Sequence, residues 1–328
     1  MQLSIVIVNW NSKNYVRDCL KNIELTKGKL QIQTIVVDGA SFDGCDQMIA
    51  SEFPSTNFVQ SLENKGFGHA NNLGVEHARA SLLLLLNPDT IVHSGAIKSL
   101  FSTLTSRSNV GLVGAKLLNT DGTLQRSSVL ADPTPLNQAL SSDLLHKHLP
   151  RSSLWKTHKA YSTGSPTSVD SVSGACMATY TDLFRKVSGF SPEFFMYSED
   201  LDLCYKIRQE GKEVFYDPNA IITHHGGGST STQKSKNSII ALRSSLYIYI
   251  KKRNGMTTAS IYLFAQQIIA ILRISLLSIM LLHRRSPSFS KRNTSRKKWV
   301  YILKWSFGLE KSISISQQNP IKGKSHLR

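Results

Sequence analysis

The chain has 328 residues, 41% of them hydrophobic, and a formal net charge of +17 at pH 7. This length exceeds that of a usual single domain, so we expect one large globular domain with an appendage. The cysteines, Cys19, Cys45, Cys176 and Cys204, lack close paired spacing, which argues against a zinc knuckle or a disulfide framework and suits a reducing cytosol. The basic residues crowd the last third of the chain around an apolar stretch, without the interleaved aromatic residues of a base-stacking platform. We therefore expect no nucleic-acid partner.

Apolar, strand-like runs alternate with helical patterns along the first hundred residues. The sequence predicts strands over residues 3–10, 33–41, 58–62 and 82–86, with helices near 15–23, 46–53 and 69–80 between them. This alternation predicts a mostly parallel, doubly wound α/β sheet. Further strands are expected at 110–118 and 169–180, and further helices at 181–187 and 199–211, whereas the polar, proline-containing segment 120–168 has no clear pattern.

Five consecutive leucines, residues 82–86, end at Asn87-Pro88-Asp89. Such a run must be buried on both faces, and proline ends regular pairing, so Asp89 is expected at the carboxyl end of a central strand. Asp38 closes the apolar run TIVVD, residues 34–38, in the same way. Two carboxylates should therefore meet at the edge where open α/β sheets bind ligands. The alternative for either aspartate is that it caps the helix that follows.

A glycine-rich segment, residues 64–74, reads NKGFGHANNLG. Its glycines would let the backbone approach a ligand, but it lacks the GxGxxG spacing of a dinucleotide-binding turn, which argues against a dehydrogenase. A nucleotidyltransferase would be expected to have a glycine-rich, basic phosphate loop after the first strand, and VNWNSKNY provides none.

Several segments together resemble the inverting family 2 glycosyltransferases of the GT-A fold. They read SIVIVNWN, VVDGASFDG, NKGFGHANNLG, LLLLNPD, SGACMATYTDLFRKVSGFSPEFFMYSEDLDLCYKIRQEG and HHGGGS, in the family order over residues 1–252. The resemblance is greatest to bacterial rhamnosyltransferases of O-antigen and exopolysaccharide assembly. It implies a mixed Rossmann-like sheet with flanking helices. It also implies transfer of a deoxyhexose, L-rhamnose from dTDP-rhamnose, to a lipid-linked or polysaccharide acceptor, or transfer of another UDP- or dTDP-linked sugar.

The resemblance also implies a metal site for the donor diphosphate. The DXD position of the family reads Asn87-Pro88-Asp89 here, so an amide replaces the first carboxylate and Asp89 is the one strong ligand of the motif. The family places His224 at the metal or the donor phosphates. Mg²⁺ or Mn²⁺ is the implied cofactor, with water and the diphosphate filling most of its coordination sphere.

The nucleotide is implied to contact three other positions. Asp38 corresponds to the family aspartate that accepts the imide N–H of uracil or thymine, and Asn9 lies near the nucleotide. Lys65 would meet the diphosphate or the base, although a solvated loop lysine explains it nearly as well.

Asp200 is the implied catalytic base. Inversion requires a carboxylate that removes the acceptor hydroxyl proton, and the family assigns this to the aspartate of the Glu199-Asp200 pair. The alternative is that both acids only favour a helix N-terminus. Asp202 is implied to hold an acceptor hydroxyl or a backbone turn, Gly174 to leave room beneath the sugars, and Arg243 to reach phosphate unless it is a solvated helix residue.

A 24-residue apolar segment, 259–282, carries one charge, Arg273, and has basic clusters on both sides. Crossing a bilayer would export one cluster, so we expect the segment to lie in the cytoplasmic face of a bacterial inner membrane, with Gln266, Gln267, Ala270 and Arg273 on a wet face. A buried core helix or a true span is the alternative. The expected domains are 1–225 (GT-A catalytic domain), 226–256 (lid and acceptor-side helix), 257–283 (membrane-associated helix) and 284–328 (basic C-terminal tail).

Overall fold

The computed structural model describes residues 2–141, 148, 152, 155, 157–226, 236–282 and 289–310. These residues fall into two compact units. The first unit holds the described residues up to Asp132 and those from 152 to 226, and the second holds those within 133–150 and 231–314. Each unit is described by itself below.

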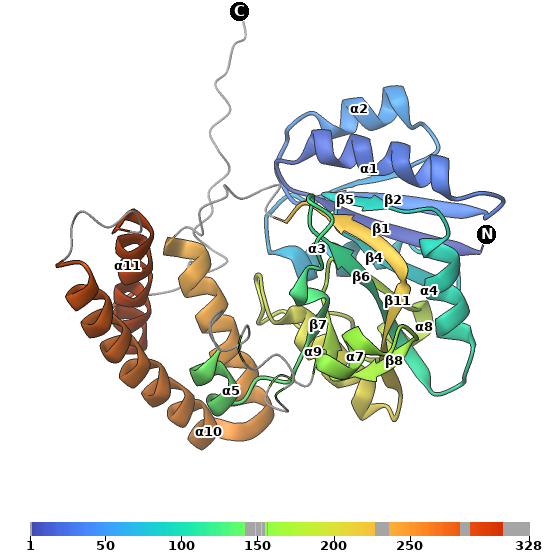
Figure 1. The fold of residues 1–328 in the computed structure, drawn as a ribbon. Coiled ribbons are helices and arrows are strands. Elements are labelled where there is room, and N and C mark those ends of the chain that lie inside the picture. The colour runs from blue at the N-terminus through green and yellow to red at the C-terminus, as the bar shows by residue number, and fades with distance from the viewer. Residues whose placement is uncertain are drawn as a thin grey trace, which may run out of the picture. The chain divides into compact units, whose positions relative to one another are not determined.

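A nine-stranded mixed sheet forms the first unit (Figure 1). Its main path runs β3 (Asn57–Gln60), β2 (Ile32–Asp38), β1 (Leu3–Asn9), β4 (Leu82–Leu86), β10 (Cys176–Tyr180), β6 (Val110–Leu118), β11 (Glu213–His224) and β5 (Thr90–Val92), with β8 (Thr167–Val169) beside β11. The first four strands are parallel, as the βα alternation predicts, while β10 is antiparallel to both β4 and β6. A small second sheet pairs β7 (Val129–Leu130) with β9 (Ser171–Val172).

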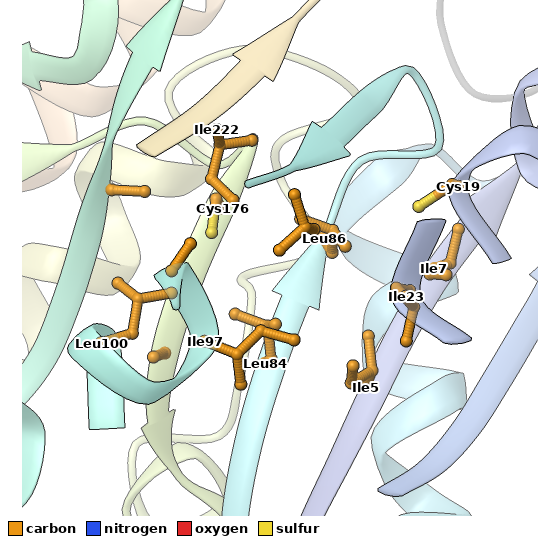
Figure 2. Close-up of a cluster of buried hydrophobic side chains, with 14 of the residues drawn as sticks. Ile5, Ile7, Cys19, Ile23, Leu84, Leu86, Ile97, Leu100, Cys176 and Ile222 are labelled. Carbon is orange, nitrogen blue, oxygen red and sulfur yellow. The ribbon is translucent and has the colours of Figure 1, made fainter. Parts of the chain in front are cut away.

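Helices cover both faces of the large sheet. The buried cluster on one face is supplied by α1 (Lys13–Thr26), α2 (Cys45–Glu52) and α4 (Ala96–Thr105), and part of it is shown in Figure 2. The other face packs against α3 (Phe67–Glu76), α8 (Thr181–Lys186) and α9 (Glu199–Gln209). The leucine run alternates between the two clusters, with Leu84 and Leu86 on the first face and Leu83 and Leu85 on the second. Continuous hydrophobicity is thus explained by burial on both sides, as expected.

The predicted α/β class is confirmed, and β4 and β6 have the expected bounds. The elements that were not anticipated include β5, α4 and the short helix α7 (His158–Ser162). The four cysteines are buried and free, in agreement with the absence of a disulfide framework.

The second unit is helical. It contains α5 (Pro135–Leu140), the long helix α10 (Lys236–Met280), whose path is broken at Gly255 with φ +84°, and α11 (Phe289–Ser306). Helix α11 packs along α10, with Ala270, Trp299 and Ile302 in a shared buried cluster. It was not predicted, because its many basic residues conceal its apolar face.

The expectation of a wet face on α10 is wrong. Gln266 and Ala270 are 1% and 0% exposed, the Gln267 side chain donates to the carbonyl of Ser306, and the Arg273 guanidinium stacks on Trp299. The face that was expected to be wet is therefore buried within the second unit, where Gln267, Ala270 and Arg273 contact α11. The solvent-facing side of α10 is apolar instead.

Candidate active site

The strand register brings the predicted residues to one edge of the sheet. Asn9 and Asp38 are directly opposite at the ends of β1 and β2, and β4 ends beside them. The antiparallel strand β10 begins at this edge, where the Asn87 N–H donates to the carbonyl of Ala175 over 2.9 Å. The end of β11 arrives from the other side, with His224 opposite Thr90. Residues far apart in the chain thus share a single edge, as expected for ligand binding in such sheets.

Asn87, Asp89 and His224 form a compact cluster at this edge. Nε2 of His224 lies 3.2 Å from Oδ1 of Asp89 and 3.3 Å from Nδ2 of Asn87. Nδ1 of the same imidazole lies 2.8 Å from Oε1 of Gln125, and the His225 N–H donates to the Asp89 carbonyl. The imidazole is therefore held from both sides, with its Nε2 directed at the carboxylate.

The donor atoms of this cluster fit a divalent cation. Oδ1 of Asn87 is buried without a hydrogen-bond partner, although buried polar atoms normally have one. A carboxylate oxygen, an amide oxygen and an imidazole nitrogen are ligand types that Mg²⁺ or Mn²⁺ accepts, with substrate phosphates and water completing the shell. Among the residues that the structure describes, no three or more His, Cys, Asp or Glu side chains are grouped so that they could hold a metal ion by themselves. Any such site is accordingly open and ligand-poor.

The Asp38 carboxylate accepts hydrogen bonds from five donors of the protein. Its Oδ1 accepts from the side chains of Asn9 and Ser41, and its Oδ2 accepts from the Ser41 and Phe42 N–H groups and from Gln60 Nε2 at 2.8–3.1 Å. A carboxylate has about four lone-pair sites, so a pyrimidine imide would have to replace one of these five donors. Asp38 anchors the turn before α2 through the Ser41 and Phe42 N–H groups, but it does not cap that helix, whose N-cap residue is Gly44.

Asn9 supports this anchor. It is fully buried, and its Nδ2 donates to Asp38 Oδ1 over 2.7 Å while its Oδ1 accepts from the Ser12 hydroxyl over 2.9 Å. The nucleotide contacts of Asn9 and Asp38 stay predictions. Lys65, by contrast, is exposed and ion-paired with Glu63 at 3.3 Å, so both of its readings stay open.

The glycines of the 64–74 segment pack against other parts of the protein, so they do not line an open ligand site. A Cβ on Gly66 would lie 2.1 Å from the Phe195 carbonyl oxygen, and its φ of +94° favours glycine independently. A Cβ on Gly68 would meet Phe190 at 2.8 Å. These contacts fix the segment that precedes Glu199 and Asp200, so the glycines act on the site indirectly.

Asp200 lies at the N-terminus of α9 with both oxygens held by backbone donors. Oδ2 accepts from the Gly174 N–H over 3.1 Å and Oδ1 from the Leu201 N–H over 2.9 Å. A Cβ on Gly174 would lie 3.5 Å from the Asp200 Cβ. Gly174 directly precedes Ala175, whose carbonyl binds Asn87, so the loop before β10 links Asp200 to the Asn87–Asp89–His224 cluster.

Glu199 and Asp200 differ in their hydrogen bonds. Burial, together with the neighbouring Asp200 charge, raises the pKa of Glu199 to about 8, and its Oε2 has no partner. Burial also raises the pKa of Asp200, but its two backbone N–H donors oppose that shift. The negative charge of the pair therefore resides on Asp200, with Glu199 protonated at neutral pH.

The backbone before this pair is unusual. Tyr197 and Ser198 have φ of +72° and +65°, values that L-residues other than glycine adopt rarely. Non-glycine residues in this region cluster at functional sites, where surrounding structure compensates for the strain. The sequence gives no sign of this turn, since neither residue type favours it.

Asp202 and Arg243 have no contact with the Asn87–Asp89–His224 cluster among the hydrogen bonds and ion pairs described here. Asp202 is 2% exposed and accepts from the Ser191 hydroxyl over 2.5 Å, with Lys206 Nζ at 3.7 Å, so the structure favours its role in a backbone turn over contact with an acceptor. Arg243 belongs to α10 in the second unit, beside Tyr262, and its phosphate contact stays a prediction. The glycines and serine of the proposed lid, residues 227–229, lie outside the described residues.

The sequence profile described as "Glycosyltransferase like family 2" matches residues 2–246. The chain belongs to this family. Among solved structures, the mannosyltransferase PcManGT of Pyrobaculum calidifontis, in complex with GDP-Man and Mn²⁺, is similar with a TM-score of 0.58 and 14% identity over 94% of this chain and 86% of that one. This likeness is one of fold, and the GT-A architecture expected from the sequence is confirmed.

Three curated relatives of this family 2 protein are named as sugar transferases. It is 27% identical to a low-salt glycan biosynthesis hexosyltransferase of Haloferax volcanii, over 65% of this chain and 63% of that protein. It is 24% identical to the N-acetylglucosaminyl-diphospho-decaprenol L-rhamnosyltransferase of Mycobacterium tuberculosis (77% and 85%) and 25% identical to the rhamnosyltransferase WbbL of Escherichia coli (76% and 93%). The chain thus spans slightly less than two thirds of the first relative and most of the other two.

Proposed function

We propose that this protein is an inverting, metal-dependent glycosyltransferase that moves L-rhamnose from dTDP-rhamnose to a lipid-linked acceptor. The observation that carries the proposal is the placement of Asp200, charged and held by two N–H groups, at the sheet edge that also presents Asp89 and His224. An inverting displacement needs these two functions on opposite sides of one reacting carbon: a base for the acceptor and charge stabilisation for the leaving diphosphate.

Asp200 is the base of the proposed mechanism. Its carboxylate takes the proton of the acceptor hydroxyl as that oxygen attacks the anomeric carbon and the bond to the diphosphate breaks. The donors from Gly174 and Leu201 orient the carboxylate, since rotation would break both bonds. Protonated Glu199 contributes no second negative charge beside the nucleophile.

Asp89, His224 and the Asn87 amide oxygen are the residues that would hold a divalent ion. When bound, such an ion supplies positive charge to the leaving diphosphate. The solved mannosyltransferase of the same fold contains Mn²⁺ beside GDP-Man, which supports a divalent ion here. Because Asp89 is the single carboxylate of the cluster, affinity for the ion should depend on the donor diphosphate.

The sugar and the acceptor are proposed from the relatives. Two of the three relatives described above are rhamnosyltransferases, and one is named for an N-acetylglucosaminyl-diphospho-decaprenol acceptor. The alternative is another UDP- or dTDP-sugar, because the relative from Haloferax volcanii is named only as a hexosyltransferase.

The proposal predicts transfer with inversion. We expect the protein, with Mg²⁺ or Mn²⁺, to convert dTDP-rhamnose and an N-acetylglucosaminyl-diphospho-lipid into a disaccharide lipid, while GDP-mannose and UDP-glucose react at least about tenfold more slowly. NMR of the product checks the anomeric configuration, which should be opposite to that of the donor. Retention would contradict the role of Asp200, and equal use of GDP-mannose would contradict the donor assignment.

We also propose that the second unit attaches the protein to the cytoplasmic membrane face without crossing it. The most apolar window of α10 is long enough to span a bilayer, yet only 11% of it is buried. Its exposed side carries large apolar side chains, while the other side packs against basic α11. The exposed residues are Ile261, Phe264, Ile268, Ile271, Leu272, Leu276 and Ile279, each at least 43% exposed. One apolar face beside lysine and arginine suits the lipid interface, whereas charges of α11 would be costly in the hydrocarbon core.

Vesicle flotation tests the attachment. We expect the L272D/L276D double variant to lose most of its binding to anionic vesicles, because it places two charges on the exposed apolar face that would contact lipid. The matched control L25D/L62D, which alters two residues of the first unit that are 85% and 86% exposed, should bind normally. High salt should weaken wild-type binding only partly. Normal flotation of L272D/L276D would contradict the proposal.

A further inference from the structure

Gln125 is held in a tight hairpin beside the His224 imidazole. The hairpin leaves the end of β6, with the Gln125 N–H donating to the Leu117 carbonyl over 2.9 Å and the Asn119 N–H to the Thr123 carbonyl over 2.8 Å. Gly122, with φ +79°, forms its turn. Because β6 pairs with β11 in parallel register, with Leu118 opposite Thr223, the hairpin lies next to the end of β11. The contact between Gln125 and His224 is therefore built by the sheet.

A continuous chain of side-chain hydrogen bonds begins at this imidazole. His224 Nδ1 lies 2.8 Å from Gln125 Oε1, and Gln125 Nε2 lies 3.1 Å from Asn119 Oδ1. Asn119 Nδ2 lies 2.9 Å from Thr123 Oγ1, which lies 2.6 Å from Asp121 Oδ1. Four bonds thus connect the candidate metal site to a surface carboxylate.

The chemistry of the last member sets the direction of the chain. Hydrogen bonds from the Thr123 hydroxyl and N–H lower the pKa of Asp121, so its carboxylate is ionised and can only accept. The Thr123 hydroxyl must then donate to Asp121 and accept from Asn119 Nδ2.

The same reasoning continues to the imidazole. With its amide nitrogen facing Thr123, Asn119 presents its oxygen to Gln125 and accepts from the Gln125 amide nitrogen. Gln125 in turn presents its oxygen to His224, so that Nδ1 carries the proton and donates it. Each amide has one possible orientation, and together they determine the tautomer.

We propose that Gln125 is a positioning residue which, with Asn119, Thr123 and Asp121, fixes the Nδ1–H tautomer of His224 and leaves its Nε2 lone pair directed at Asp89 and Asn87. In the other tautomer, Nε2–H would donate a hydrogen bond to the Asp89 carboxylate 3.2 Å away. Neither Nε2 nor that carboxylate oxygen could then bind a cation. In the fixed tautomer Nε2 carries no proton to donate to Asp89, and its lone pair accepts only the long hydrogen bond from Asn87 Nδ2, 3.3 Å away, which a cation would replace. Partners of this kind orient metal-binding imidazoles and raise their basicity. The inference rests on the proposed metal role of the cluster, but the tautomer can be measured without it.

NMR of the histidine side chains tests the tautomer directly. In the wild-type protein, at a mildly alkaline pH where imidazole is neutral, long-range ¹H–¹⁵N spectra should show His224 protonated at Nδ1, with the signal assigned through H224Q. Q125M removes the acceptor at similar volume and should move the proton to Nε2. Q125E restores an acceptor and should restore the Nδ1–H form. Q209M, at an exposed glutamine on α9, is the matched control and should leave the spectrum unchanged.

Mn²⁺ binding in the presence of dTDP provides the second measurement. Q125M should weaken Mn²⁺ affinity by about 10- to 100-fold, as measured by the electron paramagnetic resonance of free Mn²⁺, and Q125E should retain it. T123V, which interrupts the chain further out, should give a mixture of tautomers. An Nε2–H form in the wild type, or an unchanged tautomer in Q125M, would overturn the proposal. A shifted tautomer in Q125M supports it even if the wild type binds no Mn²⁺–dTDP, a result that would instead count against the proposed function.

Discussion

Replacing Asp200 by asparagine is expected to lower kcat by about 10²-fold or more, the usual scale for loss of a general base. The amide retains an oxygen for the Gly174 N–H, so the turn at the start of α9 should persist, but it cannot take the acceptor proton. Donor affinity, measured by calorimetry with dTDP-rhamnose and Mg²⁺, should change little. An equal loss of donor affinity would place Asp200 with the diphosphate instead.

The neighbouring acid provides the matched control. Glu199 already carries a proton at neutral pH, so E199Q should keep most of the activity while D200N loses it.

The raised pKa of Glu199 also has a consequence for stability. The native state holds this proton above the ordinary carboxyl pKa, so the stabilisation is complete below about pH 4.5 and is lost as pH rises through about 8. Urea unfolding of E199Q should therefore show a weaker decline across this range than the wild type.

The sheet was predictable from the sequence because burial and side-chain periodicity are local properties. The leucine run predicts a central strand, and the boundaries of β6 follow from its apolar residues alone. The sequence also placed Asp89 and Asp200 at one site, but only through the family resemblance. Their proximity depends on the antiparallel pairing of β10 with β4 and on the bonds of the intervening loop, which no local pattern encodes.

The errors and omissions have a common physical origin in side-chain hydrogen bonds. The sequence identifies Asp38 as a carboxylate at a strand end, but not that five donors already surround it. Gln125 lies in a polar segment without periodicity, and its role emerges only when the direction of each bond is traced. Likewise, Gln266 in α10 resembles a solvated residue in the sequence, whereas in the folded second unit it is 1% exposed. Residue type restricts the possible partners, whereas tertiary structure selects among them.

Replacing Asp89 by asparagine is expected to reduce the rate of transfer by about 10²- to 10³-fold, because stabilisation of the leaving charge by a bound metal is worth several kcal/mol. D89N removes the single carboxylate of the cluster. It also introduces an amide nitrogen near Nε2 of His224, which lies 3.2 Å from Oδ1 in the wild type, and a bond between them would consume the lone pair that a cation needs.

The loss in D89N should appear in metal binding as well as in turnover. We expect the Mn²⁺ affinity measured with dTDP to fall at least about tenfold, and excess Mg²⁺ to recover little of the rate. The fold should be retained, since the His225 N–H binds the Asp89 backbone carbonyl, which the substitution leaves intact. D182N alters an aspartate whose side chain is 95% exposed on α8, and this matched control should behave as the wild type does. Near-normal transfer by D89N at low Mg²⁺ would show that Asp89 does not hold the ion, and the charge of the leaving diphosphate would then have to be stabilised by the protein's own cations.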